Sequence, residues 1–271
     1  MAPRASIAGA PSPMALRSPR HLAFFDRVFT RFARRHLRAV RLARWGRPDL
    51  PAGDGPVVVF ANHPSWWDGM AVMLLWRRLL ADRELYVPMD AEALGRYGFM
   101  RRLGVFGVEP GARGAAGFLR VAAEVLSEPR RLLWINAPGR FSDARERPVP
   151  IAPGMSRLPE LAPAGTFLPL ALEYTFWNER APEMLAAFGD PIPAADLLAE
   201  GRDARAERMS AALAATMDRL AADSIARDPA LFETLLEGRR GMGGVWQAWR
   251  RAGALLRGRR FDPRHDQRAG A

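Results

Sequence analysis

The sequence predicts an α/β domain in which a mixed β-sheet is flanked by helices, with amphipathic basic helices at both ends. Three observations predict it. Short apolar runs bounded by Pro, Gly or Asn, such as residues 57–60 and 132–135, are typical of buried strands. Amphipathic segments alternate with these runs between residues 56 and 192, which favours a layered α/β arrangement. Arginine-rich segments with an apolar stripe stand at each end of the chain.

The expected elements follow one another from the N-terminus. A helix is expected over residues 21–45, because Leu22, Phe25, Phe29, Phe32 and Val40 lie near helical spacing. The other expected elements are a strand at 57–60, a helix from 65 to about 80, a strand at 85–88, a helix at 91–102 that leads to residues 105–108, a helix at 115–126, strands at 132–135, 167–176 and 183–188, and a helix at 203–227.

Composition limits the classes of protein that the chain can belong to. It has 271 residues, of which 49% are hydrophobic, so it is long enough for one large domain with a substantial core. No run of 18 apolar residues is present, so no transmembrane helix of usual length is expected. The absence of cysteine excludes a disulfide framework, a thiol nucleophile and thiolate metal sites.

Charge is distributed unevenly along the chain. Residues 1–50 have a net charge of +9 and residues 238–271 a net charge of +7, while the whole chain has +11, which leaves −5 for residues 51–237. Two basic ends on a mildly acidic body favour an anionic partner, either a membrane surface or nucleic acid.

These patterns divide the chain into four parts. Residues 1–20 are expected to be disordered, and they lack the apolar core of a signal peptide. Residues 21–50 are expected to form a basic amphipathic helix and a linker, residues 51–237 the folded domain, and residues 238–271 a basic amphipathic tail. The phenylalanine stripe of the first helix either lies in a membrane interface or packs against the domain, and both interpretations can hold together. Phe and Trp stripes at helical spacing disfavour a nucleic-acid partner.

One short segment has the residue types for acid–base chemistry. His63 follows a predicted buried strand, and Asp68 follows five residues later in the first turn of a predicted helix. Imidazole is a suitable base near neutral pH, and a carboxylate on its other nitrogen fixes the tautomer. The alternative is that Asp68 only forms a capping box with Ser65, and that His63 is an ordinary loop residue. The pair by itself leaves both interpretations open.

The surrounding sequence resembles a known family. Asn62-His63-x4-Asp68, residues 102–109, residues 134–143 and residues 168–171 are similar, in order and spacing, to the four sequence blocks of the glycerophospholipid acyltransferase superfamily, which includes the lysophosphatidate (1-acylglycerol-3-phosphate) acyltransferases. The resemblance covers about residues 50–195. It implies transfer of a fatty acyl group to a lipid hydroxyl in phospholipid biosynthesis, with acyl-CoA or acyl-carrier protein as co-substrate and no cofactor.

The resemblance also assigns site residues. It implies that His63 is the base, that Asp68 orients it, and that no metal ion is used. The substrate-binding residues that it implies are Asn62, Glu109, Arg113, Gly139 and Arg140. Membrane lipids would be the partner, and the protein would lie peripherally on the cytoplasmic face of the cell membrane.

The sequence departs from the family pattern in two blocks. Glu109 is followed by Pro110 where the family has Arg, and Pro138 stands where the family has Glu. Arg113, Arg120 or Arg140 are the candidates to replace the missing phosphate contacts. The losses favour an acceptor other than a plain glycerol phosphate, such as an amino-acid lipid or a glycosylated isoprenoid. A second alternative is a non-catalytic relative that binds lipid at a membrane surface.

Overall fold

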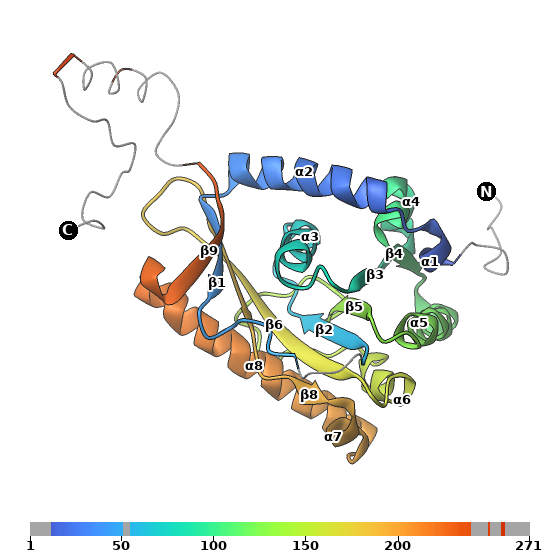
Figure 1. Cartoon of the computed structure of the whole chain (residues 1–271). Helices are drawn as coiled ribbons and strands as arrows, with labels where there is room; N and C mark the ends of the chain where they lie inside the picture. The colour runs from blue at the N-terminus through green and yellow to red at the C-terminus, as the bar shows by residue number, and fades with distance from the viewer. Residues whose placement is uncertain (1–11, 51–54, 240–248, 250–255, 258–271) are drawn as a thin grey trace.

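The computed structural model describes residues 12–50, 55–239, 249 and 256–257. Within these residues nine strands form one mixed sheet in the order β4-β3-β5-β2-β6-β7-β1-β9, with β8 paired to β6 (Figure 1). Helices cover both faces of this sheet. The predicted class, an α/β domain with a mixed sheet flanked by helices, is confirmed.

The bounds of the elements are as follows. The strands are β1 Ala39–Ala43, β2 Val57–Ala61, β3 Glu84–Asp90, β4 Val105–Val108, β5 Arg131–Asn136, β6 Thr166–Thr175, β7 Glu183–Phe188, β8 Ile192–Pro193 and β9 Phe232–Glu237. The helices are α1 Pro13–Leu16, α2 Pro19–His36, α3 Asp68–Leu79, α4 Ala91–Arg96, α5 Gly111–Leu126, α6 Leu158–Leu161, α7 Ala194–Leu198 and α8 Arg202–Ala226.

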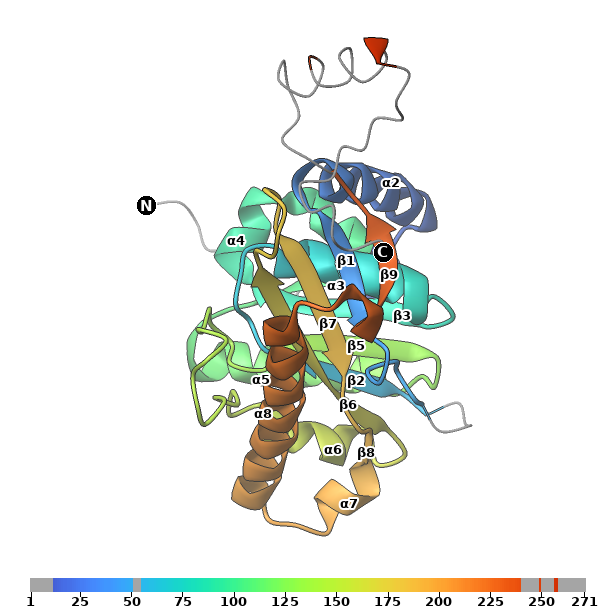
Figure 2. The same cartoon turned by 90° about the vertical axis from the view of Figure 1, so that its left-hand side faces the viewer.

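The central strand β2 shows why apolar runs form this sheet. Successive side chains of a strand point to opposite faces, so a strand that is covered on both faces must be apolar throughout. Val57 and Val59 pack on the side of α2 and α3, and Val58 and Phe60 pack on the side of α5 and α8. Figures 1 and 2 show α8 on the opposite side of the sheet from α2 and α3.

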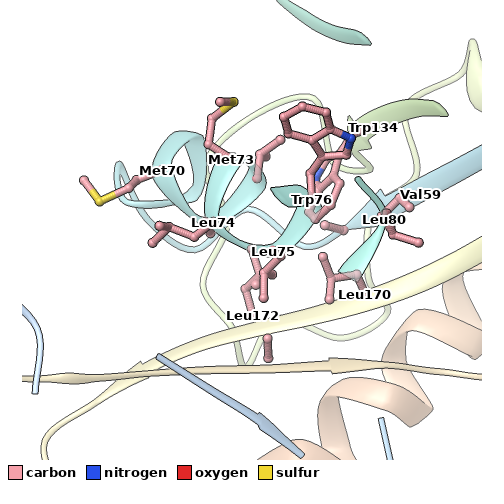
Figure 3. Close-up of a cluster of buried hydrophobic side chains, with 14 of the residues drawn as sticks. Val59, Met70, Met73, Leu74, Leu75, Trp76, Leu80, Trp134, Leu170 and Leu172 are labelled. Atoms are coloured by element: carbon pink, nitrogen blue, oxygen red, sulfur yellow. The ribbon is translucent and has the colours of Figure 1, made fainter. Parts of the chain in front are cut away.

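Helix α3 closes the core on one face of the sheet. Its buried residues run from Met70 to Trp76 and meet Trp134 of β5 and Leu172 of β6 (Figure 3). The Trp76 indole N–H donates to the carbonyl of Arg83 at 2.8 Å, so its polar atom is satisfied inside the core. This packing fixes the start of α3 against the sheet.

Strand direction determines where loop residues gather. Strands β4, β3, β5, β2 and β6 are parallel to one another, whereas β7 is antiparallel to β6. The carboxyl ends of the parallel strands therefore lie along one edge of the sheet, the usual place for a site in an open α/β sheet. The loops that follow β2, β4 and β5 all begin at this edge.

The N-terminal helix is shorter than predicted. Helix α2 ends at His36, and residues 39–43, which were expected to continue it, form strand β1 between β7 and β9. All five residues of β1 are buried, and only a strand can pair on both sides in this position. Val40 lies near helical spacing, but it also fits the alternation of a strand. Residues 21–50 are therefore part of the domain rather than an appended helix and linker.

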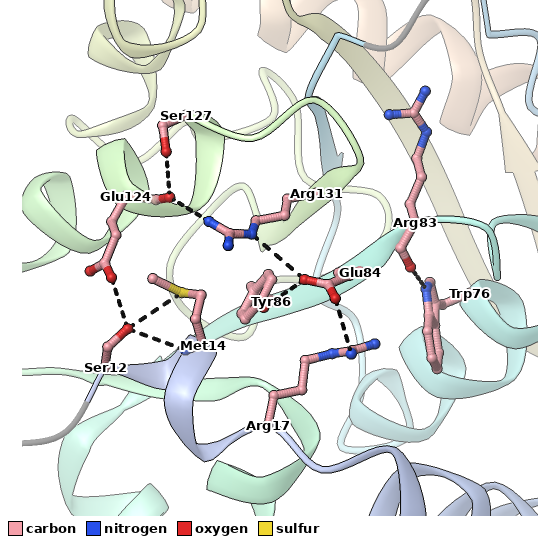
Figure 4. A network of polar contacts seen from close by, with 10 residues as sticks. All are labelled: Ser12, Met14, Arg17, Trp76, Arg83, Glu84, Tyr86, Glu124, Ser127 and Arg131. Atoms are coloured by element: carbon pink, nitrogen blue, oxygen red, sulfur yellow. Dashed lines mark hydrogen bonds and ion pairs between the residues drawn. The ribbon is translucent and has the colours of Figure 1, made fainter.

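Disorder was also expected over residues 1–20, and this is wrong for the part that the structure describes. The Ser12 hydroxyl donates to the Glu124 carboxylate at 2.9 Å, and Arg17 pairs with Glu84 at 3.6 Å (Figure 4). The Ser18 amide donates to the carbonyl of Arg102 at 2.9 Å. These partners are distant in sequence, so local composition gave no sign of them.

The C-terminal part of the domain contains a strand that the sequence analysis missed. Strand β9 pairs antiparallel with β1 and completes that end of the sheet. The predicted amphipathic tail over residues 238–271 lies outside the described residues, apart from 238–239, Trp249, Leu256 and Arg257.

A buried ion pair joins β1 to β7. Arg41 Nε lies 2.9 Å from Glu183 Oε2, and a second guanidinium nitrogen donates to Thr234 Oγ1 at 2.9 Å. Both charged side chains are buried, and burial raises the pKa of Glu183 even though Arg41 opposes that shift. Removing one partner would leave an uncompensated charge inside the sheet.

We predict that Arg41→Met lowers the free energy of unfolding by about 3–5 kcal/mol, because Glu183 would remain buried without its counter-ion. Urea denaturation measures the change. Arg47→Met is the matched control, since the Arg47–Glu233 pair is exposed and its loss is expected to change stability by less than about 1 kcal/mol. Equal losses in the two variants would contradict a specific role for the buried pair.

Candidate active site

The loop of residues 62–67 carries His63 away from the end of β2. Its first residue, Asn62, is 2% exposed and forms two hydrogen bonds with Leu172 of β6. The side-chain amide donates to the Leu172 carbonyl at 2.9 Å and its oxygen accepts from the Leu172 amide at 2.8 Å. Asn62 was predicted to bind substrate, and in the structure its side chain anchors this loop to β6.

His63 and Asp68 form a hydrogen-bonded pair. His63 Nδ1 lies 2.6 Å from Asp68 Oδ2, and Asp68 is the first residue of α3. The Asp68 side chain is fully buried, whereas the His63 side chain is 20% exposed. Because the carboxylate accepts from Nδ1–H, Nε2 carries the lone pair and is available to accept a proton.

Asp68 also makes one hydrogen bond of the kind expected in a capping box with Ser65, and this does not exclude the pair. The backbone N–H of Ser65 donates to Asp68 Oδ2 at 3.1 Å, and the Ser65 hydroxyl accepts from the amide of Trp67 at 3.2 Å. One carboxylate therefore both closes the turn before α3 and holds the imidazole of His63. The turn is what brings two residues separated by five positions into contact.

Tyr174 is a member of this cluster that the sequence analysis did not identify. It lies near the carboxyl end of β6, and its hydroxyl donates to Asp68 Oδ1 at 2.7 Å. Burial and the adjacent Asp68 carboxylate raise the pKa of Tyr174 well above its usual value. No local pattern marks this tyrosine, because its partner lies 106 positions away in the chain.

Phe141 is the second unpredicted neighbour of His63. Its ring stacks on the imidazole with centroids 4.2 Å apart and an interplanar angle of 28°. The following amide, that of Ser142, donates to the carbonyl of His63 at 3.0 Å, so the loop after β5 is attached to the loop after β2. Phe141 is 59% exposed and presents an apolar surface beside the imidazole.

The predicted residues Gly139 and Arg140 lie in the same loop. Gly139 has φ of 66°, and its N–H donates to the carbonyl of Asn136 at 3.0 Å in the turn after β5. The Arg140 guanidinium donates to Glu146 at 2.6 Å and to the carbonyl of Phe141 at 3.1 Å. The structure thus places Arg140 one residue from the ring that covers His63, with its charge matched by Glu146.

Glu109 and Arg113 lie at the same edge of the sheet but on another strand. Glu109 follows β4 and Arg113 lies in the first turn of α5, and both are exposed. Three strand positions separate β4 from β2, which corresponds to roughly 14 Å across the sheet. The structure therefore does not bring these two predicted binding residues into the cluster around His63.

The described residues lack both a candidate metal-binding cluster and a candidate membrane-spanning helix. Within the part of the chain that the structure describes, no group of three or more His, Asp or Glu residues could hold a metal ion. Across the same residues, no helix has the length and apolar character needed to span a bilayer.

Comparison with known proteins assigns the family. The model of the Acyltransferase family matches residues 24–173, which is more than half of the 271-residue chain. No curated protein matches the chain. The matched region begins inside α2, includes β1 and both loops that meet at His63, and ends one residue before Tyr174. The chain belongs to the Acyltransferase family.

Proposed function

We propose that this acyltransferase is an O-acyltransferase that moves a fatty acyl group from acyl-CoA or acyl-carrier protein to a lipid hydroxyl, with His63 as the base. The observation that carries the proposal is the 2.6 Å contact between His63 Nδ1 and the buried carboxylate of Asp68. Such a contact fixes the tautomer that leaves Nε2 as a proton acceptor.

The proposed reaction is a direct transfer. Nε2 of His63 takes the proton of the acceptor hydroxyl while the hydroxyl oxygen attacks the carbonyl carbon of the thioester. The tetrahedral intermediate collapses, the C–S bond breaks, and the thiolate takes the proton back from the imidazolium. The products are an ester and a free thiol. The chain has no cysteine, so no thiol on the enzyme could hold the acyl group between steps.

The donors that stabilise the tetrahedral oxyanion would come from the turn after β5. The N–H of Gly139 already donates to the Asn136 carbonyl. The amides of Arg140 and Phe141 follow that of Gly139 in the chain, and the Phe141 ring itself stacks on His63. These two amides are therefore the candidate donors. Backbone amides of this kind stabilise developing negative charge on a carbonyl oxygen.

The acceptor is the finer part of the proposal. A lysophospholipid-like lipid, 1-acylglycerol-3-phosphate among them, is the first candidate. The surroundings of His63 favour the alternative of a lipid without a phosphate next to the reacting hydroxyl, such as an amino-acid lipid or a glycosylated isoprenoid. Phe141 offers the imidazole an apolar neighbour, and the nearby charge of Arg140 is matched by Glu146.

Membrane association is a further part of the proposal, and the face that would carry it differs from the one expected. Phe25 and Phe29 pack against the core, and Phe25 stacks on Phe99 with centroids 4.4 Å apart. The exposed stripe of α2 consists instead of Phe24, Val28 and Phe32, spaced four residues apart. Of the two interpretations of the phenylalanine stripe, packing against the domain therefore holds for Phe25 and Phe29.

The exposed stripe continues toward the active site. Phe32 contacts Trp67 with ring centroids 5.7 Å apart, and Trp67 contacts Trp66, which is 66% exposed. Trp66 lies in the same loop as His63. Phe24, Val28, Phe32 and Trp66 are thus all exposed apolar side chains. Exposed arginines accompany them on α2, namely Arg27, Arg31, Arg34 and Arg35.

This combination suits the surface of an anionic bilayer. Apolar side chains enter the headgroup boundary, and each arginine near an anionic surface contributes on the order of 1 kcal/mol, reduced by salt. We therefore propose a peripheral location on the cytoplasmic face of the cell membrane, with His63 close to the lipid. A non-catalytic lipid-binding relative would share this surface but would not transfer acyl groups.

We predict that His63→Gln lowers kcat by about 100- to 10,000-fold, because the hydroxyl loses its base. Release of free CoA from palmitoyl-CoA measures transfer, with lysophosphatidate, a lyso-amino-acid lipid and a glycosylated isoprenoid as separate acceptors. His21→Gln is the control, since His21 is exposed and its Nδ1 lies 2.9 Å from the Ser18 hydroxyl. Retained turnover in folded His63→Gln protein would refute the mechanism, and inactivity of the unmodified protein on every acceptor would favour the non-catalytic alternative.

We predict that Phe24→Ser combined with Phe32→Ser weakens binding to phosphatidylglycerol vesicles more than tenfold, because each exposed phenylalanine that inserts into the headgroup boundary contributes about 1.5–3 kcal/mol. Vesicle co-sedimentation measures binding, with phosphatidylcholine vesicles and duplex DNA as comparison ligands. Ile225→Ser on α8 is the control, because Ile225 is 80% exposed on the other side of the sheet. Unchanged vesicle binding, or tighter binding to DNA, would contradict the membrane surface.

Point substitutions are needed because the N-terminal segment cannot be removed as a unit. Deletion of residues 1–45 would take away β1, which lies between β7 and β9 in the sheet. It would also remove Arg41 and leave Glu183 buried without its partner. A failure of such a protein to fold would say nothing about membrane binding.

A further inference from the structure

We propose that Tyr174 is a positioning residue of the active site, which acts on His63 through Asp68. Its hydroxyl donates to Asp68 Oδ1 at 2.7 Å, while His63 Nδ1 and the Ser65 amide share Oδ2. This inference rests on the proposed function, because the role of Tyr174 in positioning is defined by the base that Asp68 holds.

The three contacts fix the plane of the Asp68 carboxylate. Two of them come from the loop after β2 and the third from β6, so the two oxygens are held from different elements. The Asp68 side chain is fully buried, so water does not replace a lost donor. Rotation of the carboxylate away from His63 requires loss of the Tyr174 contact and of both contacts to Oδ2. Tyr174 thus keeps Oδ2 directed at the imidazole.

Tyr174 remains a donor throughout the range in which a histidine titrates. Its raised pKa means that the phenol stays protonated well above neutral pH. Its hydrogen bond therefore does not switch during the pH changes that protonate and deprotonate an imidazole. Tyr174 therefore donates to the Asp68 carboxylate throughout this pH range and does not act as a second acid or base.

The sign of its effect on the base follows from electrostatics. A donor on Oδ1 withdraws negative charge from the carboxylate and reduces its attraction for the imidazolium. Without that donor, the carboxylate would stabilise the protonated imidazole more strongly. More of the base would then be protonated at neutral pH, and free base would be recovered only at higher pH.

The other charged groups around the pair are engaged elsewhere or lie behind an aromatic ring. Arg140, in the loop after β5, is paired with Glu146. His36 of α2 contacts the rings of Phe32 and Trp67, with centroids 4.3 Å and 6.3 Å away. Glu173, the neighbour of Tyr174 in β6, accepts from the Ser224 hydroxyl of α8 at 2.6 Å. Removal of the Tyr174 hydroxyl is therefore the most direct test of how this carboxylate acts on His63.

A purely structural role is the competing explanation, and the chain contains a matched control for it. The Tyr86 hydroxyl donates to Glu84 Oε2 at 3.0 Å, and burial raises the pKa of Tyr86 to about 12. Glu84 begins β3, so this pair lies toward the opposite edge of the sheet from His63. Tyr86→Phe removes the same group from the same kind of contact without touching the active site.

The test compares Tyr174→Phe with Tyr86→Phe in the full chain. The first readout is the pH–rate profile of CoA release. The second is NMR titration of histidine-labelled protein, in which His63→Gln identifies the His63 signal among the 4 histidines. We expect Tyr174→Phe to move both midpoints upward by roughly one unit, to lower kcat by up to about tenfold at pH values below the midpoint with recovery at higher pH, and to leave the acceptor KM unchanged. We expect Tyr86→Phe to move neither midpoint.

An unmoved His63 titration in folded Tyr174→Phe protein would overturn the positioning role, even if activity fell. If Tyr174→Phe does not fold, replacing the 3 tyrosines with 3-fluorotyrosine keeps the native shape and strengthens the donor, and the His63 midpoint should move downward. No movement there would also overturn the proposal. Absence of acyl transfer by the unmodified protein would refute the proposed function, whereas the NMR titration still decides whether Tyr174 acts on His63.

Discussion

The buried carboxylate of Asp68 is the constraint on which the site depends. An ionised carboxylate removed from water is strongly unfavourable unless donors replace its hydration. The protein supplies an imidazole, a backbone amide and a phenol, drawn from the loop after β2 and from β6. Each of these donors is in turn held in place by its hydrogen bond to the Asp68 carboxylate. The position of His63 is therefore a consequence of satisfying this one group at the start of α3.

The order of strands makes that arrangement possible. Strand β2 lies between β5 and β6, so the ends of three neighbouring parallel strands meet at the same edge. The loop after β2 brings His63, the loop after β5 brings Phe141, and the end of β6 brings Tyr174. Asn62 locks the first of these loops to β6 by two hydrogen bonds with the Leu172 backbone. The strand order thus determines which loops and strand ends lie close enough to form the cluster.

The sequence predicted the elements whose structure is determined by their own residues and near neighbours in the chain. The apolar runs of β2 and β5 and the amphipathic pattern of α8 specify their own structure, and the His63–Asp68 spacing fits a single turn. Strand β1 was missed because its burial comes from β7 and β9, which lie far away in the chain. Tyr174 and Phe141 were missed for the same reason. Asn62 was assigned to substrate because its motif does not reveal that its amide faces a neighbouring strand.

The two sides of the imidazole have opposite character, and this difference gives the proposed reaction a direction. Nδ1–H donates to a desolvated carboxylate whose two oxygens are both hydrogen-bonded, so its proton is held away from solvent. The ring itself is covered by exposed Phe141, and Trp66 stands in the same loop. A hydroxyl that reaches Nε2 therefore arrives among apolar groups. A lipid acceptor brings its own apolar surface to that place, whereas a small polar acceptor would have to give up its hydration without compensation. Trp66 is linked through Trp67 to Phe32 of α2, so the surface proposed to contact the bilayer includes a residue of the loop that carries His63.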